Sequence, residues 1–429
     1  MQKSFAHCLR LLVLLAVQCA ATRLAGEASG IAPPEDSTPD RWVRVEELAS
    51  QGLPLDAVEL LARIQKDAME SGSYPAAVRA IGQRINLQAQ IEELSSEDRL
   101  ATLEEEVEEA PPKMKCLMHL LAASWYNGYY QSYRWQILRQ SSSNSDAESE
   151  NQNLGVLEIS RQTEFHIQEA MKEERWLKRT PLAAYAEALD AHELEAIELP
   201  TLYDLAVTVA LDFYDSDIYS VAHPEVQLRI TSPPPLLNIS EVIRWSTDAE
   251  LVAARIVRST TLYRKILDFH LLHNNRKAYA YWALKLLHFG YSRNLYPHDL
   301  ASYRYALREF ARQWPDSVLY SEALFLLAQS WKTSGDLETA QKHAEKGYNA
   351  FPESGSGLKC YNLLCKLLKK NLEVFAERVW DKADMTFQVR YRNIDKIHFR
   401  MVAADPRKVA VDSMKQERRG WNYMNTEYP

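Results

Sequence analysis

Glycine and cysteine are scarce in this chain of 429 residues, which holds 13 glycines and 5 cysteines. Few glycines beside abundant alanine, leucine and glutamate favour helices over sheets. Three cysteines lie beyond the first 28 residues, namely Cys116, Cys360 and Cys365, and three thiols do not make a disulfide framework. We interpret them as small buried side chains, with Cys360 and Cys365 on different faces of one helix.

An excess of positive charge is also lacking, since the formal net charge is −8 and the pI is about 5.8. This balance argues against nucleic acid or an anionic membrane as the main partner. Hydrophobic residues make up 46% of the chain and charged residues 25%, which is typical of a globular protein and not of a disordered one. The length suits a repeat array or two to three domains.

Catalytic motifs are absent: the sequence has no glycine-rich phosphate loop, no His-Glu-x-x-His and no Gly-x-Ser-x-Gly. His270 and His273 lie near Asp268 and could share a metal, but no further ligand is spaced to complete four. We therefore interpret His270 and His273 as ordinary helix residues and not as metal ligands. The sequence therefore predicts no catalytic, cofactor-binding or metal site. An enzyme acting on sugars is the least favoured alternative, because no paired carboxylates stand out.

No apolar run reaches transmembrane length, and the longest near the amino terminus, Leu11–Ala21, is too short to span a membrane. We interpret residues 1–28 as an export signal and residues 29–40 as an acidic, proline-containing linker. The expected location is the periplasm, the cell envelope or the extracellular space. A lipid anchor at Cys19 ranks second, because Gln18 is a poor residue before a lipid-modified cysteine.

Helical periodicity is what the chain has in abundance, and it is clearest in residues 320–352. Apolar residues three and four apart give the first helix one face, Gly335 ends that helix, and Asp336 opens the next. The second helix carries small residues where a neighbour can come close, at Ala340, Ala344 and Gly347. This pattern predicts a helical hairpin of the tetratricopeptide type, which must stack on others to bury its apolar face.

Residues 41–371 are predicted to continue this helical repeat. The spacing of Leu48, Gly52 and Ala57 returns at Trp331, Gly335 and Ala340. Thr201 and Asp204 form a capping-box pattern at the start of another helix. Polar residues 141–153 and proline-containing residues 221–237 are expected to be connections. Gly290 is expected to end the helix at residues 277–289. Further helices are expected at residues 74–90, 91–109, 114–137, 157–177, 181–189, 248–272, 300–314 and 358–368.

The helix predicted at residues 114–137 carries an unusual run of aromatic side chains. Such a stripe could line a groove for a sugar or a peptide, but it more often fills a core between helices. We favour the core. The aromatic residues are Trp125, Tyr126, Tyr129, Tyr130, Tyr133 and Trp135.

After Asn371 the period of the apolar residues changes from that of a helix to two. Residues 387–391 and residues 397–401 alternate apolar and polar, and four residues, Arg392 to Asp395, separate the two runs. This predicts a β-hairpin, with a strand at residues 373–379 before it. Because the chain stops at Pro429, we expect residues 372–429 to be the start of a truncated β-domain.

Several segments resemble the amino-terminal region of bacterial alpha-2-macroglobulin family proteins. Their order and spacing, more than any single motif, carry the resemblance across nearly the whole chain after the signal. The segments are Arg41-Trp42 through Pro54, Trp135-Gln136-Ile137, Leu199 through Asp204, Leu262 through His270, Phe351 through Ser354 with Cys360, and Val389-Arg390-Tyr391-Arg392-Asn393. In that family a signal peptide and a helical region precede a string of β-sandwich domains.

The resemblance implies a role in trapping proteases, in which cleavage of a bait segment collapses the domains around the protease. An internal thioester in such proteins needs Cys-x-Glu-Gln, and none of Cys116, Cys360 and Cys365 is followed by that pattern. We therefore expect a scaffold or docking module without bait or thioester. Its expected partners are its own downstream macroglobulin domains, target proteases or envelope proteins.

A free-standing periplasmic repeat protein that binds other proteins is the alternative. The two hypotheses differ in what lies beyond Pro429, where the first expects many β-sandwich domains. They differ also in whether residues 29–380 retain a stable partner from an envelope extract without any β-domains.

Overall fold

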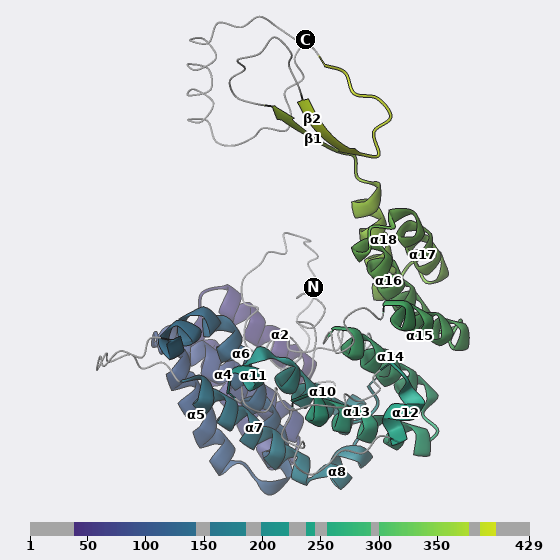
Figure 1. The fold of residues 1–429 in the computed structure, drawn as a ribbon. Coiled ribbons are helices and arrows are strands. Elements are labelled where there is room, and N and C mark those ends of the chain that lie inside the picture. Colours follow the sequence, from purple (N-terminus) through teal and green to yellow (C-terminus); the bar gives the residue numbers. More distant parts are fainter. Residues whose placement is uncertain are drawn as a thin grey trace, which may run out of the picture. The chain divides into compact units, whose positions relative to one another are not determined.

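The structure is a computed structural model that describes residues 38–142, 155–185, 199–222, 237–244, 255–292, 300–376 and 387–399. The described residues are mainly helical and include one short two-stranded antiparallel sheet, so the fold class is as expected (Figure 1). The contacts divide the chain into one unit that runs to Cys360 and a second that begins at Tyr361. Among these residues, no helix combines the length and apolarity needed to cross a membrane. The expected export signal at residues 1–28 lies outside them.

The first half of the helical unit consists of helices that pack on their neighbours in the sequence. The most extensive contacts join α3 to α4 and α6 to α7, and α5 packs on both α4 and α6. The elements are α2 (Thr38–Ser50), α3 (Pro54–Ser71), α4 (Tyr74–Ile91), α5 (Ser96–Glu109), α6 (Pro112–Ser142), α7 (Val156–Lys172), α8 (Glu174–Arg179) and the 3-10 turn η1 (Leu182–Tyr185).

The second half continues with the same kind of packing. Here α10 packs on α13, α13 on α14 and α15 on α16, and α16 and α17 form the tightest pair. The elements are α10 (Leu202–Asp215), α11 (Asp217–Ala222), α12 (Ile239–Arg244), α13 (Arg255–Leu272), α14 (Arg276–Ser292), α15 (Leu300–Gln313), α16 (Val318–Thr333), α17 (Leu337–Ala350) and α18 (Gly355–Leu368).

The turns of the first and last hairpins share one geometry, as their sequence spacing predicts. Gly52 has φ of 78° and Gly335 has φ of 88°, a left-handed conformation that glycine adopts without steric cost. The amide that follows each glycine donates to a carbonyl five residues back, from Leu53 to Leu48 at 2.9 Å and from Asp336 to Trp331 at 3.1 Å. Both helices thus end in the same left-handed cap, which satisfies carbonyls that the helix itself leaves unpaired.

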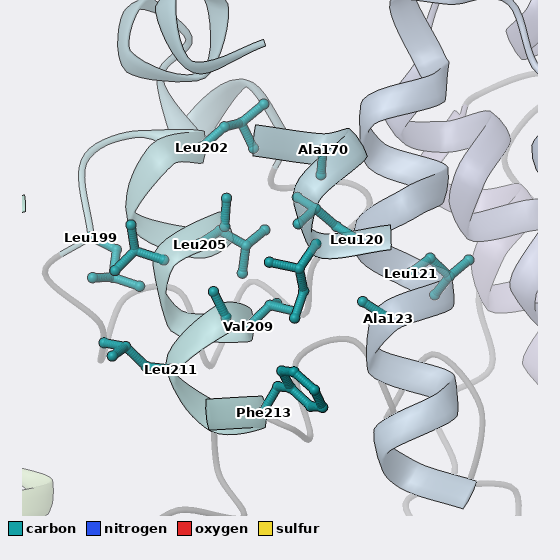
Figure 2. Close-up of a cluster of buried hydrophobic side chains, with 14 of the residues drawn as sticks. Leu120, Leu121, Ala123, Ala170, Leu199, Leu202, Leu205, Val209, Leu211 and Phe213 are labelled. Carbon is teal, nitrogen blue, oxygen red and sulfur yellow. The ribbon is translucent and has the colours of Figure 1, made fainter. Parts of the chain in front are cut away.

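One hydrophobic core links α6, α7 and α10. Figure 2 shows Leu205 and Val209 of α10 lying between their own helix and the helix that carries Leu120 and Ala123. All but one residue of α10 are buried, because neighbours cover this short helix on most sides. The labelled members of this core are Leu120, Leu121, Ala123, Ala170, Leu199, Leu202, Leu205, Val209, Leu211 and Phe213.

Two details of the helical prediction are wrong. Gly290 does not end its helix, since α14 continues to Ser292 and Gly290 is buried within it. The helix expected at residues 181–189 is a 3-10 turn over Leu182–Tyr185 in its described part. Pro181 instead forms an isolated antiparallel bridge with Thr201, and the Leu182 amide donates to the Pro200 carbonyl at 3.0 Å. Pairing with a distant segment replaces the local hydrogen bonds of a helix there.

The short sheet pairs β1 (Asn371–Ala376) with β2 (Phe387–Arg392), so the strand predicted at residues 373–379 exists. The predicted hairpin between β2 and residues 397–401 is wrong for its described part, because residues 397–399 are not a strand. Asn393 has φ of 55°, and its side-chain amide donates to the carbonyl of Leu367 at 2.7 Å. This bond holds the end of β2 against the last turn of α18, where a direct return of the chain would have to begin.

Candidate functional site

The aromatic stripe of α6 is mostly core, as we favoured. Trp125, Tyr126, Tyr129 and Tyr130 are buried, and Tyr133 is partly buried against the core. Trp135 differs from that expectation, since 71% of its surface is exposed and Arg134 lies over its ring at 5.4 Å. The buried rings therefore do not line a groove for a ligand, and they join α6 to its neighbouring helices.

Asp204 is the centre of a buried polar cluster at the start of α10. Its Oδ1 accepts from His270 Nε2 and Trp282 Nε1, both at 2.7 Å. Its Oδ2 accepts from the Thr201 hydroxyl at 2.6 Å and the Thr201 amide at 3.1 Å. The carboxylate is fully buried, so these four donors replace water. The predicted capping box is confirmed, and the same carboxylate also ties α10 to α13 and α14.

His270 and His273 do not form a metal pair. His270 donates to Asp204, whereas Nδ1 of His273 lies 2.8 Å from the carbonyl of Phe269 in its own helix. The Phe269 ring lies against both imidazoles, with centroids at 4.8 Å and 4.6 Å. In the described ranges of the chain, no group of three His, Cys, Asp or Glu side chains could hold a metal ion.

A second buried polar cluster joins α5, α6 and α7, and the sequence analysis did not find it. Nδ1 of His119 on α6 lies 2.9 Å from Nδ1 of His166 on α7. Nε2 of His166 lies 2.8 Å from Oε1 of Glu104 on α5, and the Tyr126 hydroxyl donates to the same oxygen at 2.8 Å. The two histidines are 47 residues apart in the sequence, so no local pattern of residues predicts their contact.

The hydrogen bonds of this cluster determine its protonation. Burial raises the pKa of Glu104, but hydrogen bonds from His166 and Tyr126 outweigh it and lower that pKa, so Glu104 is a carboxylate. Burial and the neighbouring His166 lower the pKa of His119 from 6.5 to about 4, so His119 is neutral at pH 7. We call the cluster of Glu104, His119, Tyr126 and His166 the histidine joint, and hydrogen bonds connect its four side chains at neutral pH.

The three cysteines of the helical elements do not act as one group. Cys116 and Cys360 are buried, and burial raises the pKa of each thiol to about 12. Such thiols stay protonated and are poor nucleophiles. Cys365 is exposed, so its assignment as a buried side chain is wrong. It lies on the face of α18 opposite the buried Cys360, and the prediction that the two point to different faces is confirmed.

The β1–β2 ribbon presents an apolar face to solvent. In its register Leu372 pairs with Tyr391, Val374 with Val389, and Ala376 with Phe387. Directly opposed residues of an antiparallel pair share a face, so these six side chains lie on one side. Leu372, Val374, Phe387 and Tyr391 are all exposed, by 45% to 63% of their surface.

The other face of the ribbon is mostly polar. It pairs Asn371 with Arg392, Glu373 with Arg390, and Phe375 with Gln388. The Arg390 guanidinium lies over the ring of Phe375 at 5.3 Å, and Phe375, the one large apolar side chain on this face, remains 47% exposed. The ribbon thus has the pattern of a sheet whose apolar side packs on a second layer, and the apolar face is the candidate interaction surface.

Comparison of the chain with protein-family models and with curated proteins finds no match to either.

Proposed function

We propose that this chain is the amino-terminal helical scaffold of an exported, macroglobulin-type protease-trapping protein. The apolar face of the β1–β2 ribbon carries the proposal. A two-stranded ribbon is marginal by itself, and one with an exposed apolar face needs a second sheet to cover it. We propose that this cover is a sheet of a β-sandwich formed by further strands of the same protein.

The helical part supports a scaffold in preference to a catalyst. Stacked helical hairpins give an extended surface for protein contacts. The two buried polar clusters bond their own groups. The Cys-x-Glu-Gln pattern of a thioester is not in the sequence, and the thiols of Cys116 and Cys360 are protonated. Any covalent capture of a protease belongs to another part of the protein.

The first test is the size of the natural product. Antibodies raised against the helical region should detect, in envelope or culture fractions of the source cells, a mature protein much larger than the 49.3 kDa of this chain. A mature product of that size or smaller would count against the proposal. It would favour the free-standing binding scaffold, particularly if that product retained a partner protein.

The second test is trapping itself. The complete natural protein should leave a general protease active on a small chromogenic peptide but inactive on a large protein substrate, because a trap excludes by size. Val374→Asp, on the apolar face, should weaken trapping, whereas Glu373→Lys, on the polar face of the same strand, should not. Equal effects of the two variants would remove the ribbon from the proposal.

A further inference from the structure

Within the part of the chain that the structure describes, the histidine joint is the one buried cluster in which two imidazoles lie within hydrogen-bond distance of each other. His119 is 8% exposed and His166 is fully buried. His166 stacks on the ring of Tyr126 with centroids 5.7 Å apart and an interplanar angle of 22°, and Phe165 packs edge-on against both histidines. These contacts fix the rings, so the 2.9 Å between the two Nδ1 atoms is set by packing.

Only one proton fits between the two Nδ1 atoms. If His166 donates its Nε2–H to the Glu104 carboxylate, its Nδ1 is a bare acceptor for the Nδ1–H of His119. A proton added to His166 Nδ1 would place two N–H groups face to face and break the contact. A proton added instead to the remaining nitrogen of His119 keeps the contact but creates a buried cation.

The surroundings compensate such a cation only in part. The groups that face His119 are Glu104 from α5, Lys115 on its own helix, and Glu169 from α7. Lys115 opposes a positive charge on the imidazole, and Glu169 is already paired with Lys172 at 2.5 Å. Other charged side chains of α6 and α7 have ion-pair partners of their own. On α7, Glu158 pairs with Arg161, and Glu164 pairs with Arg258 of α13. Arg134 of α6 pairs with Asp217 of α11.

We propose that the histidine joint is an acid-sensitive latch that fastens α7 to α6 at neutral pH and releases it below about pH 5. The joint lies in the most extensive helix contact of the described residues, and Ala170 of α7 belongs to the core shown in Figure 2. Loosening α7 would therefore uncover the buried side of α6. This use of the latch rests on the export proposed above, because an exported protein meets external changes of pH directly. Acidity would then change a surface that neutral conditions keep closed.

Hydrogen exchange of the whole chain at pH 7.5 and pH 5.0, corrected for the intrinsic effect of pH on exchange, tests the latch. Exchange of amides in residues 156–172 should rise at least tenfold at pH 5.0, while amides in residues 318–350 should change by less than threefold. His119→Asn keeps a side-chain N–H donor near the Nδ1 position and cannot take up a proton, so it should abolish the rise. His273→Asn removes a histidine that bonds only its own helix, and it should respond like the wild type.

A tenfold rise that persists in His119→Asn, or an equal rise in residues 318–350, would overturn the proposal. Imidazole NMR of the unaltered chain gives an answer even if a variant fails to fold. The His119 ring should remain a neutral imidazole with its proton on Nδ1 down to about pH 5. Titration of that ring near pH 6.5, as for a solvated histidine, would also overturn it.

Discussion

Ser321 of α16 donates a hydrogen bond to the backbone carbonyl of Gly347 on α17 at 2.6 Å, and this contact fixes how closely the two helices approach. A Cβ on Gly347 would lie 2.6 Å from Sγ of Cys360 and 3.2 Å from Cβ of Leu324. The glycine is therefore required by a neighbouring helix on each side and not by its own backbone conformation. Cys360 adds a weak bond from its thiol to the Ser321 carbonyl at 3.5 Å.

Replacing Gly347 by alanine should destabilise the helical unit by about 1 to 3 kcal/mol, because the added methyl forces α17 and α18 apart. Urea unfolding followed by circular dichroism would measure the change. Gly355→Ala is the matched control, since no atom lies within 4 Å of a Cβ there. That control should change stability by no more than about 0.5 kcal/mol. Equal losses in the two variants would contradict the packing argument.

Asp204 and Asp336 both bond a backbone amide at the start of a helix, Asp204 as the third residue of a capping box and Asp336 as the N-cap. Only Asp204 is buried with three partner residues. We expect Asp204→Ala to cost about 3 kcal/mol or more, because it removes the acceptor of the Thr201 amide and leaves the His270 and Trp282 donors buried without an acceptor. Asp336→Ala should cost about 1 kcal/mol, the usual value for an exposed cap. Urea unfolding of the wild type and the two variants measures the loss of unfolding free energy in each. A similar loss at both positions would show that the buried hydrogen bonds contribute little.

The planar guanidinium of Arg304 stacks on a ring and donates hydrogen bonds at the end of α16. The group lies 3.5 Å from the centroid of the Trp331 ring, and it donates to the Ser330 carbonyl at 2.8 Å and the Ser334 hydroxyl at 2.6 Å. Arg304→Lys keeps the charge but loses the planar fork, so we expect a loss of about 1 to 2 kcal/mol. Arg308→Lys, at an exposed position one turn later on α15, should be close to neutral in the same thermal or urea measurement.

Stability should fall as the pH drops from about 6.5 towards 4. The folded-state pKa of His119 is lowered to about 4, so the unfolded chain takes up a proton first and unfolding becomes easier over that window. Allowing for partial solvent screening, the contribution is about 1 to 2 kcal/mol. Urea titrations of the wild type and His119→Asn at pH 7.5, 6.0 and 5.0 should show a smaller loss in the variant. Parallel curves would mean that other groups cause the acid response.

Thiol labelling should separate the cysteines of the helical elements. Cys365 is exposed, whereas burial raises the pKa of Cys116 and Cys360 to about 12 and hides their sulfur atoms. We expect iodoacetamide to modify Cys365 at least about a hundredfold faster than the other two at pH 8. Mass spectrometry of the peptides would follow each site, and unfolding in urea should make the three rates alike. Fast labelling of Cys360 in the folded chain would contradict the packing of Gly347.

The local features of this fold were predictable from the sequence. Gly52 and Gly335 predict left-handed helix caps, and the apolar spacing between Tyr320 and Trp331 predicts a helix face. Caps and helix faces were predictable because each depends on residues within one or two helical turns. The capping box at Thr201 and Asp204 is equally local. The prediction at Gly290 was wrong because glycine occurs at buried positions within helices as well as at helix ends. Gly290 is buried within α14.

Contacts between distant segments were not predictable. The histidine joint brings together residues 47 positions apart, and the buried partners of Asp204 lie 66 and 78 positions beyond it. The alternation in residues 387–391 predicted a strand but not its partner. That strand pairs with residues 371–376, and Asn393 at its end bonds the last turn of α18.

By itself the sequence determined that this chain would form capped helices and then turn to extended structure, because propensity, caps and period are properties of neighbouring residues. Only the tertiary structure decided that Asp204 would collect four donors, that two imidazoles would share one proton, and which side of the ribbon would be apolar. Those outcomes depend on which helices and strands become neighbours, and that choice is made by packing over the whole molecule.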